Sequence, residues 1–241
     1  MKINPKTRHQ DLAQHVKEQL GFISVEDVKS SVVVMVLIIY DVPLLLALLS
    51  IYKLEFLWIV SPFILILHLW AIRLLIKDPY STQFEMVLFM GMWGSFGAIS
   101  LFILIQGMSY YTLQITSLFY YIIMNVASIV LMYIYVRYQI NKYAGDPTRE
   151  RKRSNQSKYM GLLTASPAIG YILGQSMQET TVLKHVFATV VIYFFVILFM
   201  YIASKFLHRY FFIRANMDYV NYHPYSNKEK NKLKKQGMEI K

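Results

Sequence analysis

The sequence predicts an all-α, polytopic integral membrane protein, in which six transmembrane helices form a bundle and both termini are cytoplasmic. Three observations predict this fold. Of the 241 residues, 56% are hydrophobic and only 16% are charged, whereas about 25% of the residues of soluble domains are charged. The apolar residues form continuous runs instead of the alternating pattern of barrel strands. The basic residues lie almost entirely between these runs.

Six runs are long enough to cross a hydrocarbon core about 30 Å thick, which takes about 20 helical residues. The predicted transmembrane domain, residues 31–206, contains spans at 31–50, 54–76, 84–106, 112–136, 159–177 and 181–206. The fifth span is the least hydrophobic, so we expect the other helices to bury it. Residues 1–30 and 207–241 are predicted to be cytoplasmic segments. A basic loop at 137–158, between the fourth and fifth spans, is predicted on the same side.

Loop charge predicts the orientation. With six spans, 23 of the 25 lysine and arginine residues lie on the side of the termini, and only Lys53 and Lys184 lie on the other side. Basic residues in short loops remain in the cytoplasm, so both termini are predicted there. The residue usage, rich in lysine, isoleucine, asparagine and tyrosine, favours the cytoplasmic membrane of a bacterium.

The first cytoplasmic segment contains an amphipathic pattern over residues 11–20. Leu12, Val16 and Leu20 recur on one helical face, and Gly21 is a typical stop. We expect this short helix to lie at the lipid surface, with docking of a partner as the alternative.

Basic residues of the loop and tail are predicted to contact anionic lipid head groups, because each contributes about 1 kcal/mol near such a surface. They are Arg149, Arg151, Lys152, Arg153, Lys232, Lys234 and Lys235. The alternative is that they only retain the topology. Nucleic acid is not an expected partner, because the tail lacks the interleaved aromatic residues that typically stack on bases.

Polar residues inside the spans indicate a candidate site. An ionisable side chain at mid-membrane is costly, and its presence suggests a function. Asp41 and His68 lie on consecutive antiparallel spans at depths that differ by about 5 Å at 1.5 Å per residue, so we expect them to pair. Asn125, near the middle of the fourth predicted span, completes the predicted cluster. The cluster is either a structural clamp between helices or a proton or cation site.

Prolines and small residues give further expectations. Pro43, Pro62 and Pro167 are predicted to bend their helices, since proline lacks the backbone donor of a regular turn. Two stripes of small residues are predicted to allow close helix packing. They are Gly91, Gly94 and Gly97 in the third span and Ser166, Gly170 and Gly174 in the fifth. Packing within one chain is the first interpretation, and a homo-oligomer interface is the alternative.

The sequence has no recognised catalytic signature. It contains no cysteine, no phosphate-binding Gly-Lys-Ser loop and no hydrolase or metalloprotease motif. Its histidines do not have metal-ligand spacing, and no cofactor is expected. The sequence therefore favours a protein that is not an enzyme.

Two functions fit these expectations. The first is a membrane protein that acts by contacts with another membrane protein, such as an accessory subunit of a secretion or export system or an immunity protein against a membrane-targeting toxin. The alternative is a small transporter or permease subunit that uses Asp41, His68 and Asn125. Six helices with cytoplasmic ends are broadly similar in topology to the permease halves of ABC exporters.

Overall fold

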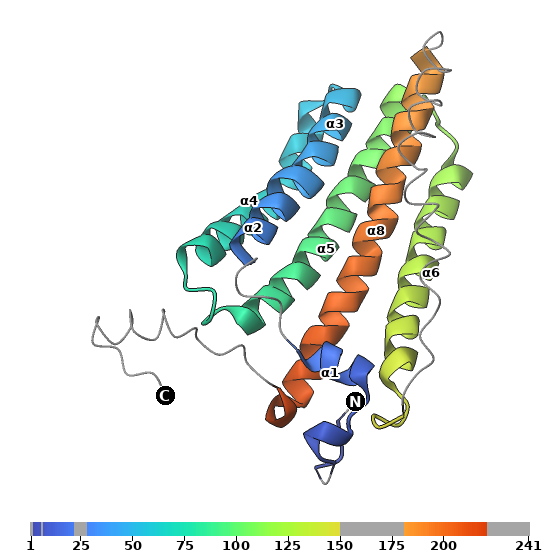
Figure 1. Ribbon diagram of the computed structural model, residues 1–241. Coiled ribbons are helices and arrows are strands. Elements are labelled where there is room, and N and C mark those ends of the chain that lie inside the picture. The colour runs from blue at the N-terminus through green and yellow to red at the C-terminus, as the bar shows by residue number, and fades with distance from the viewer. Residues whose placement is uncertain (1, 6, 22–27, 150–180, 221–241) are drawn as a thin grey trace.

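The computed structural model describes residues 2–5, 7–21, 28–149 and 181–220, and all regular structure in these ranges is helical (Figure 1). Five of the helices are long and apolar enough to cross a membrane. The predicted fifth span, 159–177, lies outside the described residues. The described part is therefore a helical bundle of the multi-pass membrane type.

The first long helix changes type along its length. It consists of α2 (Val28–Val33), the π-helical segment η2 (Val34–Tyr40) and α3 (Asp41–Ile51). The remaining long elements are α4 (Leu54–Ile76), α5 (Gln83–Gly107) with its π-helical extension η3 (Met108–Thr112), α6 (Leu118–Tyr143) and α8 (Thr181–Ala215). Three short helices complete the described chain: η1 (His9–Asp11), α1 (Gln14–Leu20) and η4 (Met217–Tyr219).

Two boundaries differ from the predicted spans for identifiable reasons. Residues 108–112 continue α5 as η3, so α6 begins at Leu118 and not at 112. The last candidate span covers 34 residues, Val182–Ala215, and is about 51 Å long at 1.5 Å per residue. It exceeds a hydrocarbon core of about 30 Å, so part of it extends beyond the core.

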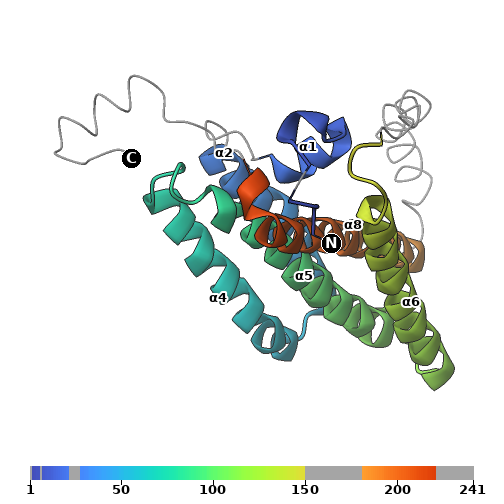
Figure 2. The same ribbon diagram turned by 90° about the horizontal axis from the view of Figure 1, so that it is seen from below.

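The bundle is arranged around the pair formed by α5 and α8, which share the most extensive helix contact (Figures 1 and 2). The first long helix and α4 lie on one side of this pair, and α6 lies on the other. Trp93 of α5 packs edge-on against Phe199 of α8, with ring centroids 4.8 Å apart. Both side chains are almost completely buried, so this contact lies within the hydrophobic core.

Helix direction follows from ring contacts between α6 and α8. Tyr135 lies 5.7 Å from Tyr201, and Tyr143 lies 5.7 Å from Phe212. Both helices therefore run in the same direction (Figure 1). The N-terminal cap, defined as residues 2–5 and 7–21, packs at the end where both helices finish. We call this the cap end of the bundle and the opposite one the far end.

Candidate functional site

Asp41 and His68 form an interhelical pair. His68 Nε2 of α4 lies 3.1 Å from Asp41 Oδ2 at the start of α3. The other ring nitrogen, Nδ1, lies 2.8 Å from the Ile64 carbonyl oxygen. A carbonyl oxygen only accepts hydrogen bonds, so Nδ1 must carry a proton and donate it.

With Nδ1 protonated, one further proton lies between His68 Nε2 and Asp41 Oδ2. A hydrogen bond between Nε2 and Oδ2 needs one proton, which is held either by His68 as an imidazolium or by Asp41 as a carboxylic acid. The pair has zero net charge in both forms. Both side chains are about one third exposed, 32% for His68 and 30% for Asp41, so the pair lies at the lateral surface of the bundle.

The position of Asp41 depends on the proline that follows it. The Asp41 backbone N–H donates to Val36 O, five residues back, which closes the π-helical segment. A regular α-helix resumes at Asp41, so Pro43 lies in its first turn, and its missing N–H leaves a carbonyl of the preceding π-helical segment without that donor. The interruption predicted at Pro43 is thus a change of helix type immediately before the aspartate. π-Helical turns of this kind often occur at functional sites.

Pro62 lies inside α4, which is continuous from Leu54 to Ile76. Proline leaves the carbonyl four residues back without its usual donor, here that of Trp58. The Ser61 hydroxyl donates to this Trp58 oxygen at 3.0 Å and replaces the missing bond. Pro167 lies outside the described residues.

Asn125 does not join the Asp41–His68 pair, which corrects the predicted cluster. Its side-chain oxygen accepts a hydrogen bond from Gln106 at 3.4 Å, and its side-chain nitrogen donates to Tyr121 O at 2.8 Å. Because α6 begins at Leu118, Asn125 lies in its far half and not at its middle.

The depth of this second pair can be estimated. A Cβ at Gly107, the neighbour of Gln106, would lie 3.1 Å from the Ile51 side chain. Asp41 begins the 11-residue helix α3 that ends at Ile51, which corresponds to about 15 Å at 1.5 Å per residue. The Gln106–Asn125 bond therefore lies near the far end, roughly 15 Å from the depth of Asp41.

A further polar contact was not predicted. The hydroxyl of Tyr40 lies 3.2 Å from the hydroxyl of Ser100 on α5. Both residues are fully buried. Tyr40 precedes Asp41, so this bond attaches the first long helix to α5 beside the candidate pair. The only signal in the sequence was a tyrosine next to an aspartate within an apolar run.

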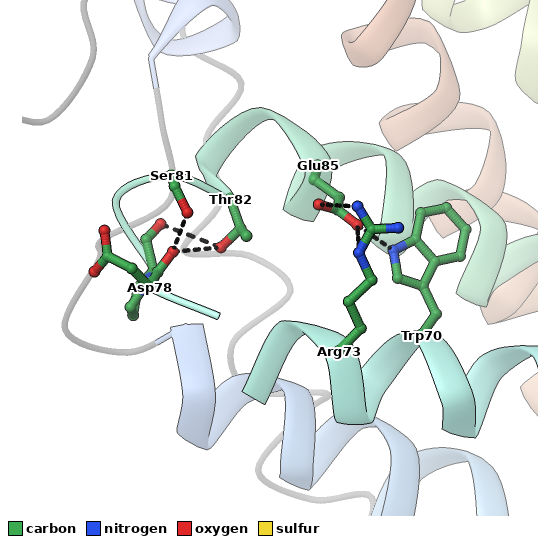
Figure 3. A network of polar contacts seen from close by, with 7 residues as sticks. Trp70, Arg73, Asp78, Ser81, Thr82 and Glu85 are labelled. Carbon is green, nitrogen blue, oxygen red and sulfur yellow. Dashed lines mark hydrogen bonds and ion pairs between the residues drawn. The ribbon is translucent and has the colours of Figure 1, made fainter. Parts of the chain in front are cut away.

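A network at the cap end links α4 to α5 (Figure 3). Glu85 Oε1 accepts a hydrogen bond from Trp70 Nε1 at 3.0 Å and lies 3.3 Å from Arg73 Nε. In the adjoining turn, the Ser81 and Thr82 hydroxyls donate to the Asp78 carbonyl oxygen. Loop charge counts Arg73 among the 23 basic residues on the side of the termini and does not reveal its pairing with Glu85, because this pairing depends on how closely α4 and α5 approach.

The glycines of the third predicted span contact α8. A Cβ at Gly94 would lie 2.6 Å from the Ala203 nitrogen and 2.9 Å from its Cα. A Cβ at Gly97 would lie 2.6 Å from the Phe199 ring, and one at Gly91 2.8 Å from the Leu207 side chain. The stripe is thus occupied within the chain and is not open to a second copy. Ser166, Gly170 and Gly174 lie outside the described residues.

The apolar face of the amphipathic helix in the N-terminal cap packs against the bundle and not against lipid, which corrects that expectation. Leu12, Val16 and Leu20 are almost completely buried in a cluster that includes Tyr143 of α6 and Phe212 of α8. Burial against the bundle removes the apolar face that a lipid surface would have needed.

Arg209 of α8 fastens this cap. It donates from Nε to Gln19 O at 3.2 Å and from Nη2 to Glu18 O at 3.3 Å and to Gly21 O. These are carbonyls at the end of α1, which lack helical partners and carry the negative end of the helix dipole. The Ile3 backbone N–H donates to Asn216 Oδ1 at 2.6 Å, so the cap is attached both to α8 and to the residue that directly follows it.

One of the predicted lipid-contacting residues lies in the described region. Arg149 is exposed, next to a turn in which Asp146 Oδ1 accepts hydrogen bonds from the Thr148 backbone N–H and hydroxyl at 2.9 and 2.7 Å. These bonds favour the ionised carboxylate and lower the pKa of Asp146. Outside the described residues lie Arg151, Lys152, Arg153, Lys232, Lys234 and Lys235.

Five helices of spanning length and composition define the chain as an integral, multi-pass membrane protein. No family model matches it, and neither a curated protein nor a solved structure does.

Proposed function

We propose that this protein is a non-enzymatic, six-span protein of a bacterial cytoplasmic membrane that acts through contacts with another membrane protein. An accessory subunit of a secretion or export system and an immunity protein against a membrane-targeting toxin both fit this description. The observation that carries the proposal is the separation of the polar groups. Asp41–His68 and Gln106–Asn125 bond at different depths, whereas a transport pathway would need polar groups that converge.

The geometry of the chain supports the six-span topology. Within the described residues, α6 ends at the cap end and α8 begins at the far end (Figure 1). Residues 143 and 181 therefore lie at opposite ends of the bundle, which supports the predicted crossing at 159–177. Lys53 lies in the short link before α4, at the far end, whereas the cap end holds Lys2, Arg8 and Lys17. This asymmetry favours a cytoplasmic cap end.

The test is purification in mild detergent from the native host, together with deletion of the chain. We expect one membrane protein to co-purify in a fixed ratio, and deletion to change either export or toxin sensitivity. A monodisperse protein without a partner, combined with an unchanged phenotype, would refute the proposal. We expect anionic lipid head groups to bind the basic residues at the cap end and so help to retain that end in the cytoplasm. They are not expected to determine which partner binds.

The second candidate is a small transporter or permease subunit. One observation favours it, namely that the Asp41–His68 pair holds a single proton that either residue can carry. Reconstitution into vesicles with a pH-sensitive dye, beside the Asp41→Asn variant, tests this function. Proton flux that disappears in the variant would replace the first proposal with this one, and no flux under any gradient would remove it.

A further inference from the structure

The Asp41–His68 pair has an unused hydrogen-bond acceptor. Asp41 Oδ2 is engaged by His68 Nε2. Among the described residues, none donates a hydrogen bond to the other carboxyl oxygen, Oδ1. In the ionic form Oδ1 is a carboxylate oxygen, and in the neutral form, with the proton on Oδ2, it is the carbonyl oxygen of the acid. In both forms of the pair Oδ1 can only accept.

The surroundings of this acceptor are apolar and exposed. Leu45 lies one turn beyond Asp41 on the same face of α3, and Leu65 lies one turn from His68 on α4. Their side chains are 56% and 60% exposed. We call the surface that contains Asp41, Leu45, Leu65 and His68 the α3/α4 seam. In hydrocarbon no water is present to satisfy an acceptor, and an unsatisfied one is costly.

We propose that the α3/α4 seam docks a transmembrane helix of another protein, and that this helix carries a side chain with an N–H or O–H donor at the depth of Asp41. The proposal rests on the proposed function and names the intramembrane chemistry of the partner. A purely apolar helix would leave Oδ1 unsatisfied, and a helix that offers only an acceptor would face a second acceptor. A donor completes the pair without changing its net charge.

The chain contains no cysteine, so the seam can be tested by disulfide cross-linking. The protein with Leu65→Cys is reconstituted in vesicles of phosphatidylcholine and phosphatidylglycerol with a synthetic peptide of about 20 leucines. One peptide has a central asparagine and a cysteine one turn away, and the control peptide has leucine in place of the asparagine. A membrane hydrogen bond predicts about threefold or greater cross-linking of the asparagine peptide.

Three variants make this result specific. Asp41→Leu should abolish the preference for the asparagine peptide. Leu45→Trp retains both Asp41 and His68 and should block the seam by its bulk. It therefore tests the seam independently of Asp41→Leu, which could lose the preference by misfolding. Ile129→Cys, in place of Leu65→Cys, labels a comparably exposed position on α6 (69% for Ile129) and should show no preference between the peptides.

Equal cross-linking of the two peptides at Leu65→Cys would overturn the inference, as would the same preference at Ile129→Cys. A protein–protein disulfide that displaces the peptide would also overturn it, by assigning the seam to a second copy of the chain. If a native partner co-purifies with Leu45→Trp as well as with the unchanged protein, the proposed function stands but the α3/α4 seam is not its docking site. Loss of that partner in Leu45→Trp, but not in an Ile129→Trp control, would support both.

Discussion

The α5–α8 pair and α6 are equally helical and apolar but differ in burial. In its most apolar stretch α5 is 56% buried, whereas the corresponding stretch of α6 is 6% buried within the described residues. Glycines let the backbone of α8 contact α5, while α6 presents large side chains such as Phe119 and Ile129 outward. Hydropathy cannot distinguish these helices. Packing is therefore closest between α5 and α8, whereas α6 exposes most of its described side chains to lipid or to partners.

The largest expected effect is at the centre of that pair. Gly94→Ala places a Cβ against the backbone of Ala203, which cannot move aside as a flexible side chain can. We expect a loss of about 3 kcal/mol, at the upper end of overpacking costs, measured as a lower unfolding temperature in detergent. The matched control is Gly145→Ala, where a Cβ would meet nothing within 4 Å and the temperature should not change. Equal shifts would contradict the special role of the α5–α8 contact.

The next effect concerns the N-terminal cap. Arg209→Met retains much of the aliphatic packing but removes the charged donors to the α1 carbonyls. Hydrogen bonds to charged groups contribute about 1.5–3 kcal/mol, so hydrogen exchange of the amides of residues 14–20 should become at least about tenfold faster. Amides of α5 provide the internal control. Accelerated exchange in both elements would mean that Arg209 stabilises the whole bundle and not the cap alone.

A smaller effect is expected at the buried hydroxyl pair. Tyr40→Phe removes the bond to Ser100, and hydrogen bonds between membrane helices average about 0.6 kcal/mol. Ser100 can then donate to a carbonyl of its own helix, as serines in helices commonly do, which keeps the loss small. The double variant with Ser100→Ala should cost less than the two single losses combined. Strict additivity would show that the two hydroxyls do not interact.

The smallest effect is at the exposed turn after α6. The lowered pKa of Asp146 means that its ionised form stabilises the turn above the ordinary carboxyl pKa, and that this contribution is lost as the pH falls through the lowered value. Asp146→Asn should therefore remove the pH dependence of Thr148 amide protection between neutral and strongly acidic solution. A pH dependence that persists in the variant would assign it to another group.

The sequence predicted most of what depends on apolar run length and on depth. Run length predicted, in the right order, the five long helices that the structure describes, and the second of them has the predicted bounds, 54–76. The rise per residue predicted that Asp41 and His68 lie within reach, and the structure places them 3.1 Å apart. Run length is a property of a single helix, and the depth of the Asp41–His68 pair involves only two consecutive antiparallel helices.

The remaining features depend on contacts between distant segments. Asn125 was misplaced because π-helical η3 extends α5 and delays the start of α6. The pattern at residues 11–20 predicts a helix on lipid, because nothing in the sequence indicates that Tyr143 and Phe212 form a docking surface for it. Glu85 was missed because only the packing of α4 on α5 brings Trp70 and Arg73 to it.

The attachment of Ile3 to Asn216 joins residues 213 positions apart in the chain. Since a polypeptide is synthesised from its amino terminus, residues 2–21 are made long before α8, and their docking surface is incomplete until α8 has been made and inserted. Closure of the cap therefore requires that α6 and α8 are already in place in the membrane.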